Sequence, residues 1–348
     1  MKNILICPDI HFCQNWSIIR ERGKRYSARL ENCIKSINWV MNTALQNNCS
    51  SIFYLGDFFN RSDLNAEEIT ALSSLDFDIG INQFSIVGNH EIKTKDNFFN
   101  SSNCLQKFII FNKYQLLEDD KTAIHLVPYL CDCVSDIGDI IKKVPNKKNL
   151  ILSHNDLKGI NYGNYISENG FDLESINKNC DLFINGHIHN SSWINEKILN
   201  LGILTGQNFN EDCSKYDHHI AILDLDTFNI RLIENPYAFN FIEIKNINNS
   251  KDLITSIENL NKNNLVIYVK VPIEIQIEVK NILEDYKNKQ KVFTYKIVIE
   301  RKYNSLPDDK KEDVKFLKNN PLQDLRKCIL EYVDNSDLTK SELDIICS

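Results

Sequence analysis

Five short segments of the sequence are rich in side chains that bind metal ions. Aspartate and asparagine oxygens and histidine nitrogens suit divalent cations such as manganese, iron or zinc. Five of the eight histidines of the chain fall in these segments. Divalent cations held by such side chains can activate water and stabilise charge on attacking and leaving oxygens. The segments are Asp9-Ile10-His11, Gly56-Asp57, Gly88-Asn89-His90-Glu91, His154 and Gly186-His187-Ile188-His189.

Each segment directly follows a short, mostly apolar run, which is typical of a buried strand. In α/β sheets, ligands bind beyond the carboxyl ends of the strands, so loops that are distant in sequence can meet there. The order of the segments is therefore an order of strands, and we expect them to form one site. The five runs are 3–7, 51–55, 83–87, 149–153 and 181–185.

The spacing of apolar residues over 27–47 predicts an amphipathic helix that covers the sheet. Further runs predict strands at 114–117, 123–127, 198–201, 219–225 and 228–233. Together these patterns favour an α/β fold in which a layered β-sandwich is flanked by helices.

Composition indicates an ordinary folded protein. Of 348 residues, 43% are hydrophobic and 25% are charged, which excludes disordered and membrane-spanning classes. The first nine residues read as a core strand and not as an export signal. The 11 cysteines include no Cys-x-x-Cys pair, the closest being Cys131 and Cys133, which predicts free thiols in a reducing, intracellular and cytoplasmic setting.

A basic segment follows the first of the five motifs. Residues 20–29 carry five bases and one acid, although the formal net charge of the chain is −7. Such a cluster can bind phosphates despite an acidic whole. A solvated loop that leads into the helix is an equally good interpretation. The candidate DNA-binding side chains are Arg20, Arg22, Lys24 and Arg25.

Glycine usage divides the chain, because all 11 glycines lie at or before Gly206. We expect a turn-rich domain at 1–237 and a small α+β capping domain at 238–301, with the order strand, helix, strand, helix, strand. The alternation of isoleucines at 273–279 also fits a strand, but the longer pattern favours a helix. A charged linker at 302–320 and a C-terminal helical pair at 321–348 are expected to follow.

In this order the five segments resemble the calcineurin-like metallophosphoesterase superfamily. The resemblance implies two divalent metal ions that share the carboxylate of Asp57, and it places His90 at the scissile phosphate. There His90 would stabilise charge or protonate the leaving oxygen. By the same resemblance, His125, His218 and His219 have structural roles. The implied ligands are Asp9, His11, Asp57 and His189 for the first metal, and Asp57, Asn89, His154 and His187 for the second.

Finer features resemble the SbcD-type nuclease subunits of double-strand-break repair complexes, including those of phages. These features are the segments 87–91, 127–129 and 201–204, together with the length. The resemblance implies a manganese-dependent DNA exonuclease and endonuclease, although iron, zinc or cobalt would suit the same ligands. It also implies a homodimer, and an SbcC-type coiled-coil ATPase partner that binds 321–348.

The chain departs from that pattern at two places. Asn60 replaces a frequent aspartate, and Gly202-Ile203-Leu204 lacks a frequent proline. Two alternatives stay open: a phosphatase or cyclic-nucleotide phosphodiesterase that uses the same site, and a non-catalytic scaffold subunit. The tethered C-terminal segment argues against the first alternative, and the complete ligand set argues against the second.

Overall fold

The structure is a computed structural model that describes residues 3–14, 19, 21–94, 100–132, 134–160, 166–211 and 213–300. Residues 1–298 form one compact unit. The predicted linker and C-terminal helical pair lie outside the described residues, as does Arg20. The predicted domain boundaries therefore stay predictions.

The first of two large sheets has the strand order β12-β11-β1-β2-β3-β4. Its strands β1 to β4 are parallel to one another, whereas β11 and β12 run antiparallel to their neighbours. The strands are β1 (Asn3–Cys7), β2 (Cys49–Tyr54), β3 (Asn82–Ile86), β4 (Ile109–Phe111), β11 (His219–Asp224) and β12 (Ile230–Glu234).

The second large sheet has the order β5-β6-β7-β8-β10-β9. Its inner strands β6, β7, β8 and β10 are parallel, and the two edge strands are antiparallel. The strands that were predicted before the five motifs are confirmed in both sheets. The strands here are β5 (Gln115–Glu118), β6 (Thr122–Val127), β7 (Lys148–Ser153), β8 (Leu182–Asn185), β9 (Ser192–Trp193) and β10 (Ile198–Asn200).

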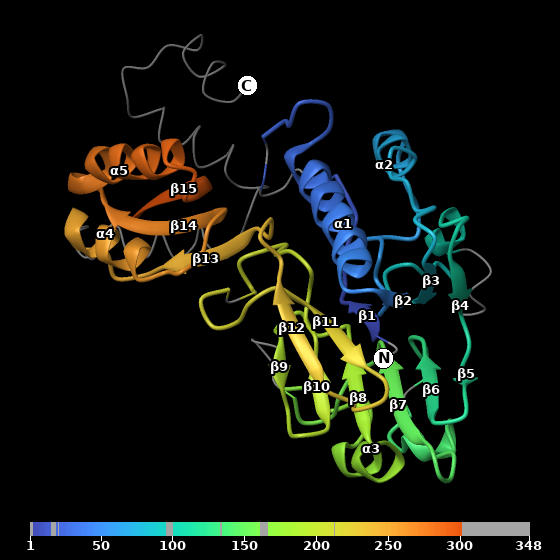
Figure 1. Cartoon of the computed structure of the whole chain (residues 1–348). Coiled ribbons are helices and arrows are strands. Elements are labelled where there is room, and N and C mark those ends of the chain that lie inside the picture. Colours follow the sequence, from blue (N-terminus) through green and yellow to red (C-terminus); the bar gives the residue numbers. More distant parts are fainter. Residues whose placement is uncertain are drawn as a thin grey trace, which may run out of the picture. The chain divides into compact units, whose positions relative to one another are not determined.

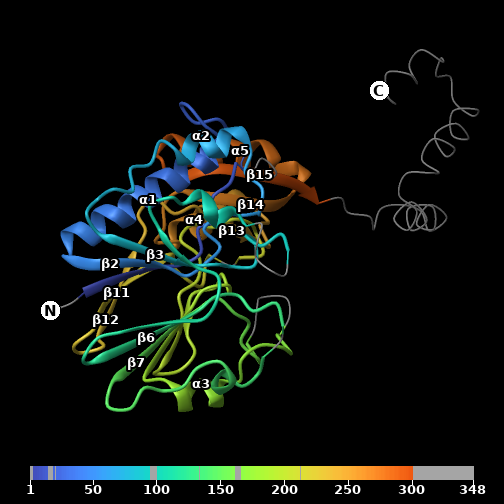
Figure 2. The same ribbon diagram turned by 90° about the vertical axis from the view of Figure 1, so that its right-hand side faces the viewer.

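The two sheets pack face to face as a sandwich (Figure 2). Alternation along β1 shows how the sequence specifies this, because successive side chains of a strand point to opposite faces. Ile4 and Ile6 belong to the core between the sheets, where they join residues of the second sheet such as Leu150. Leu5 and Cys7 belong to the core on the outer face of the first sheet.

Helices cover the outer faces of the sandwich (Figure 1). Helix α1 (Ala28–Gln46) confirms the helix predicted at 27–47, and Ser27 caps it by accepting a hydrogen bond from the backbone N–H of Leu30. The short helix α3 (Leu173–Asn179) lies against the second sheet, where Ile176 is buried. The other helices that the structure describes in this part are α2 (Ala66–Leu72) and the 3₁₀ turns η1 (Ser101–Cys104) and η2 (Ile137–Asp139). The predicted α/β layered fold is therefore confirmed.

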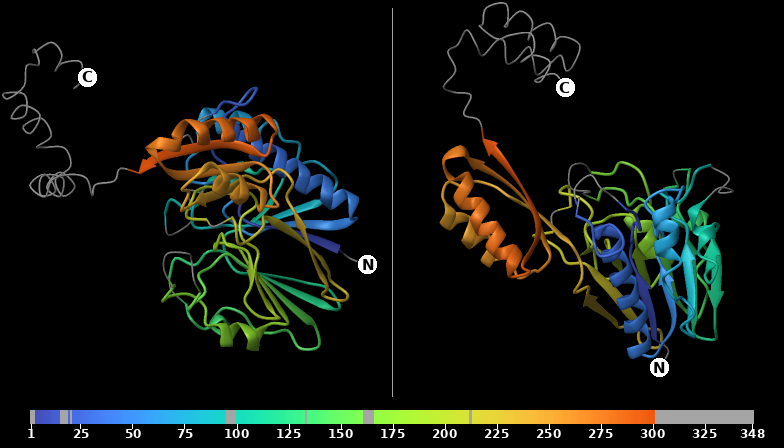
Figure 3. Two further views of the ribbon diagram at one scale, coloured as in Figure 1. Left: turned by 90° about the vertical axis from the view of Figure 1, so that its left-hand side faces the viewer. Right: turned by 90° about the horizontal axis from the view of Figure 1, so that it is seen from above.

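A third sheet, of order β13-β14-β15, follows with its own helices (Figure 3). The predicted order of strands and helices is confirmed, and 273–279 forms a 3₁₀ turn and the start of a helix. Val279 and Leu283, one helical turn apart, are buried, whereas Ile277 is exposed. The elements are β13 (Asn240–Ile244), α4 (Ser250–Glu258), β14 (Leu265–Pro272), η3 (Ile273–Ile275), α5 (Gln276–Asn288) and β15 (Val292–Glu300).

The cysteines of the described residues are free thiols, as predicted, and most of them are buried. Cys104 and Cys131 are the exposed ones in that part of the chain. Among the described helices, none has both the length and the apolar character that a bilayer crossing requires.

Arg29 lies in the basic segment but is buried in the fold, with 1% of its surface exposed. Its guanidinium donates to the backbone oxygens of Gly206 at 2.7 Å and Ile10 at 3.2 Å, and more weakly to that of Thr205 at 3.5 Å. Ile10 lies between two of the predicted metal ligands. Arg29 therefore ties α1 to two loops of the candidate site.

Replacing Arg29 with methionine should lower the free energy of unfolding by about 3–5 kcal/mol, because buried carbonyls lose a charged donor. Chemical denaturation of the metal-free protein measures this change. Arg25→Met is the matched control, since Arg25 is exposed in the same segment. It should change stability by less than about 0.5 kcal/mol. Equal effects of the two substitutions would contradict the structural role of Arg29.

Candidate metal centre

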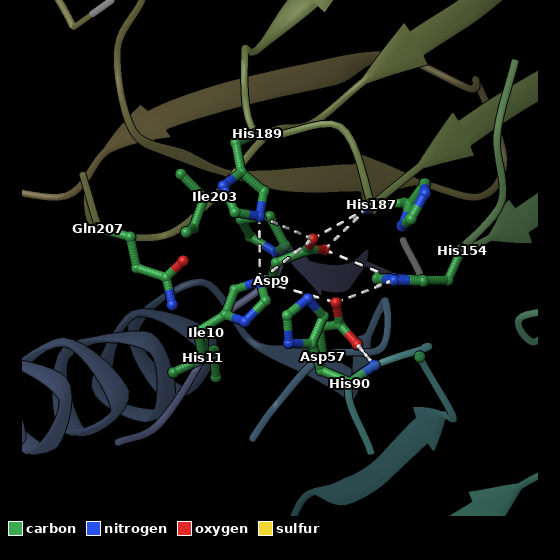
Figure 4. A network of polar contacts seen from close by, with 12 residues as sticks. Asp9, Ile10, His11, Asp57, His90, His154, His187, His189, Ile203 and Gln207 are labelled. Atoms are coloured by element: carbon green, nitrogen blue, oxygen red, sulfur yellow. Dashed lines mark hydrogen bonds and ion pairs between the residues drawn. The ribbon is translucent and has the colours of Figure 1, made fainter. Parts of the chain in front are cut away.

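The loops that follow five parallel strands bring the predicted metal-binding side chains together (Figure 4). Asp9, Asp57 and Asn89 follow β1, β2 and β3 of the first sheet. His154 follows β7 of the second sheet, and His187 and His189 follow β8. The centre is thus formed where the carboxyl ends of parallel strands from both sheets meet.

The first set of donor atoms consists of Asp9, His11, Asp57 and His189. The Nε2 atoms of His11 and His189 are 3.0 Å apart, and each is 4.0 Å from Oδ2 of Asp9. Oδ2 of Asp57 is 3.6 Å from Nε2 of His11. Metal–nitrogen and metal–oxygen bonds of about 2.0–2.2 Å place neighbouring ligand atoms about 3–4 Å apart. These residues therefore fit a single divalent cation.

The second set consists of Asp57, Asn89, His154 and His187. Nε2 of His154 is 3.3 Å from Oδ2 of Asp57 and 3.1 Å from Oδ1 of Asn89. Nδ1 of His187 is 3.0 Å from the same asparagine oxygen. Oδ2 of Asp57 therefore faces both sets, as a bridging ligand would. The structure brings all seven predicted ligands together, while their role in binding metal stays a prediction.

Hydrogen bonds select the ring nitrogen that each of three histidines presents to the centre. Nδ1 of His154 lies 2.6 Å from the backbone oxygen of Leu55, and Nδ1 of His189 lies 2.8 Å from Oε1 of Glu211. Nε2 of His187 lies 3.3 Å from Oδ1 of Asp156. Oxygens of these kinds only accept, so the facing ring nitrogen carries the proton. The opposite nitrogen keeps its lone pair for a cation.

Two of these partners, Asp156 and Glu211, were missed by the sequence analysis. Asp156 follows His154 by two residues, so its place in the same loop was a usable signal. Glu211 lies 22 residues beyond His189 in a stretch without any pattern. Only the folded chain brings its carboxylate to the imidazole.

The electrostatics of the centre favour added positive charge. Burial raises the pKa of Asp9, a shift that His154 reduces and Asp57 increases. Burial also acts to raise the pKa of Asp57, but His154 and His11 outweigh it and leave the pKa below its usual value. Burial lowers the pKa of His154, but Asp57 and Asp9 raise it to about 9. Buried carboxylates thus draw a proton onto His154, and a divalent cation would satisfy the same demand.

Two motif glycines are required by close packing around the carboxylates. A Cβ atom at Gly88 would lie 2.2 Å from Oδ1 of Asp57, and one at Gly186 would lie 2.5 Å from Oδ1 of Asp9. Three predicted ligands also have left-handed backbones, with φ of 50° at His11, 45° at Asp57 and 73° at His187. Backbone strain of this kind collects at functional sites.

Glu91 braces two loops of the centre and does not face a donor set. Its buried carboxylate accepts hydrogen bonds from the backbone N–H groups of Phe58 at 2.9 Å and Gly88 at 2.8 Å. Burial raises the pKa of Glu91 to about 7, and the charge of Asp57 adds to the rise. The motif residue after His90 therefore holds the Asp57 loop against the Asn89 loop.

His90 lies at the exposed side of the centre, with its ring edge-on to that of His11 at 4.7 Å. Its backbone N–H donates to Oδ1 of Asp57 at 2.9 Å, and its Nδ1 donates to the backbone oxygen of Asn60 at 2.9 Å. The amide of Gln207 in turn holds Oδ1 of Asn60 at 2.8 Å. Asn60, which replaces a frequent aspartate, thus positions His90 through its main chain.

The basic segment is partly neutralised. Nη1 of Arg22 is 3.0 Å from Oε1 of Glu67, and the guanidinium of Arg25 lies over the ring of Tyr26. Lys24 and Arg25 are exposed. Binding of DNA by this segment stays a prediction.

Replacing Glu211 with glutamine should weaken the binding of Mn²⁺ about 10-fold to 100-fold, because His189 loses a charged acceptor that orients it. Titration calorimetry of the metal-free protein measures the affinity. Glu174→Gln, an exposed position on α3, is the matched control and should leave the affinity unchanged. If Glu211→Gln binds as tightly as the control, Glu211 does not support a metal ligand.

Comparisons with known proteins identify a family for this chain. A search of curated proteins found no match. Among solved structures, the chain is similar to a hypothetical protein from Thermus thermophilus, at 11% identity and a TM-score of 0.39, over 67% of this chain and 100% of that one. Residues 2–191, more than half of the chain, match the calcineurin-like phosphoesterase family. The chain therefore belongs to the calcineurin-like phosphoesterase family.

Proposed function

We propose that this protein is a DNA nuclease that hydrolyses backbone phosphodiesters with two divalent metal ions. The observation that carries the proposal is the position of Asp57, whose Oδ2 faces His11 at 3.6 Å and His154 at 3.3 Å. One carboxylate oxygen between two donor sets suits a pair of cations, since a shared anion offsets their repulsion.

The donor chemistry agrees with two cations. Asp9, His11 and His189 complete the first set, and Asn89, His154 and His187 complete the second. Imidazole, carboxylate and amide ligands accept manganese, iron, zinc or cobalt, and we propose Mn²⁺. When bound, such cations lower the pKa of water and neutralise charge on phosphate oxygens.

His90 is proposed to act on the leaving oxygen. Its Nδ1 is committed to the backbone oxygen of Asn60, so Nε2 is the nitrogen that can exchange a proton. A protonated Nε2 would donate to the oxygen that leaves the phosphorus, and an exposed ring can reach a substrate. The Asn60–Gln207 contact holds His90 in that orientation.

DNA is proposed as the substrate because the centre is open to solvent and other parts of the chain offer surfaces for a long substrate. Two of its histidines are partly open to solvent, with side-chain exposure of 17% for His187 and 23% for His189. Lys24 and Arg25 add exposed positive charge. The third sheet with α4 and α5 supplies a further surface, and the motifs around His90 and Tyr129 resemble SbcD-type nucleases.

Wild-type protein with Mn²⁺ should cleave linear duplex DNA but release no phosphate from a phosphopeptide. His90→Ala should lower the cleavage rate about 100-fold to 10,000-fold and leave Mn²⁺ affinity unchanged, because His90 is a proton donor and not a ligand. Asp57→Ala should abolish both the binding of Mn²⁺ and the cleavage of DNA. His219→Ala on β11 is the histidine control.

Two outcomes would contradict the proposal. Turnover of the phosphopeptide without DNA cleavage would identify a phosphatase. Tight metal binding without any turnover, including that of a generic phosphodiester, would identify a scaffold subunit.

We also propose that an SbcC-type coiled-coil ATPase binds residues 321–348, which lie outside the described residues. Apolar residues at helical spacing, beginning at Leu322 and Leu325, support an amphipathic docking helix. Deleting 321–348 should abolish co-purification with the ATPase and keep the Mn²⁺ affinity of the full chain. Normal ATPase binding by the shortened chain would exclude this docking site.

A further inference from the structure

A pocket of about 190 Å³ adjoins the candidate metal centre. Tyr129 and Leu130 line it from the loop after β6, and Asn155 and Asp156 from the loop after β7. Phe171 contributes a buried aromatic wall. The pocket is therefore bounded by loops from the same sheet that supplies His154.

Hydrogen bonds hold the walls of the pocket in place. The buried amide of Asn155 donates to the backbone oxygen of Pro128 at 3.0 Å and accepts from the backbone N–H of Leu130 at 3.0 Å. The backbone N–H of Phe171 donates to the backbone oxygen of Asp156 at 3.0 Å. The two loops and the Phe171 segment are thus joined, so the pocket is part of the fold.

Two residues that line the pocket, Tyr129 and Asp156, also contact His187 of the metal centre. The ring of Tyr129 lies 5.8 Å from the ring of His187, centroid to centroid. Oδ1 of Asp156 lies 3.3 Å from Nε2 of the same histidine. If a phosphate of the substrate lies at the metal centre, the base of the same nucleotide can therefore reach this pocket.

The charge of the described lining residues disfavours a second phosphate. Asp132 and Asp156 contribute carboxylates, and the described residues that line the pocket include neither lysine nor arginine. Leu130, Val134 and Phe171 add apolar surface, and Asn155 and Asn169 add amide groups. A cavity of about 150 Å³ can hold a benzene ring, so this volume suits one flat ring. Nucleobases are flat, uncharged and carry N–H donors that a carboxylate can accept.

We propose that this pocket is a subsite for one unpaired nucleobase of the DNA strand that is cut. The base stacks on Tyr129 while its phosphate lies at the metal centre. This inference rests on the proposed nuclease function and deepens it. It implies that the enzyme engages a nucleotide that has left its duplex partner, so single strands and frayed ends are the preferred substrates.

The test combines a protein variant in which the pocket is filled with a DNA strand that lacks one base. Single-stranded oligonucleotides carry one abasic residue, moved step by step past the cleaved bond. For the wild-type protein, one position should raise KM on the order of tenfold and leave kcat nearly unchanged, because base stacking is lost. Val134→Trp fills the pocket and should raise KM for the intact strand to the same level. In this variant the abasic residue should cause no further loss.

Two further variants secure the result. Tyr129→Ala removes the stacking ring without adding bulk, so it should reproduce the effect if Val134→Trp folds poorly. Ile109→Trp is the control, since Ile109 is 51% exposed on β4 and lies outside the pocket. The subsite alone would be overturned if the increases in KM from Val134→Trp and from the abasic residue add when the two are combined. It would also be overturned if the abasic residue has no effect at any position. A wild-type protein that hydrolyses bis(p-nitrophenyl) phosphate but no DNA strand would overturn the nuclease function, and the subsite with it.

Discussion

The carboxylate of Asp57 is the constraint on which the rest of the centre depends. It is 1% exposed, and burying a charge costs free energy unless partners compensate. One oxygen accepts from the backbone of His90, and the other faces His11 and His154. The neighbouring backbone packs closely against this carboxylate, so residue 88 must be a glycine, without a side chain, where it passes Asp57.

The packing of the two sheets of the β-sandwich sets the surroundings of this carboxylate. The first sheet supplies Asp57, and the second supplies His154, so the distance between the sheets sets the distance between the donors. Apolar side chains such as Ile6 and Leu152 fix that distance in the shared core. Close-packed interiors resist change, which gives donor atoms a stable separation before any cation binds. Arg29 adds a second brace, because it joins α1 to the loop that carries Asp9.

Much of the fold could be predicted because most strands and the long helix α1 left a local signal. The strands before the five motifs are apolar runs, and α1 has both a helical apolar stripe and a serine cap. Strands β4 and β9, of three and two residues, were not predicted. The burial of Arg29 could not be predicted, since a buried arginine and a solvated one look the same in a sequence.

The sequence by itself determined which donors are present, in what order they follow the strands, and hence the class of reaction. The motifs can be recognised in the sequence because several of their residues lie within three or four positions of one another. Only the tertiary structure decided which atoms of those residues face each other, through partners such as Glu211 and Asp156. It alone also placed a base-sized pocket beside His187. The reason is physical: hydrogen bonds between distant segments and the space between loops depend on how the chain packs, and packing leaves no periodic mark along the chain.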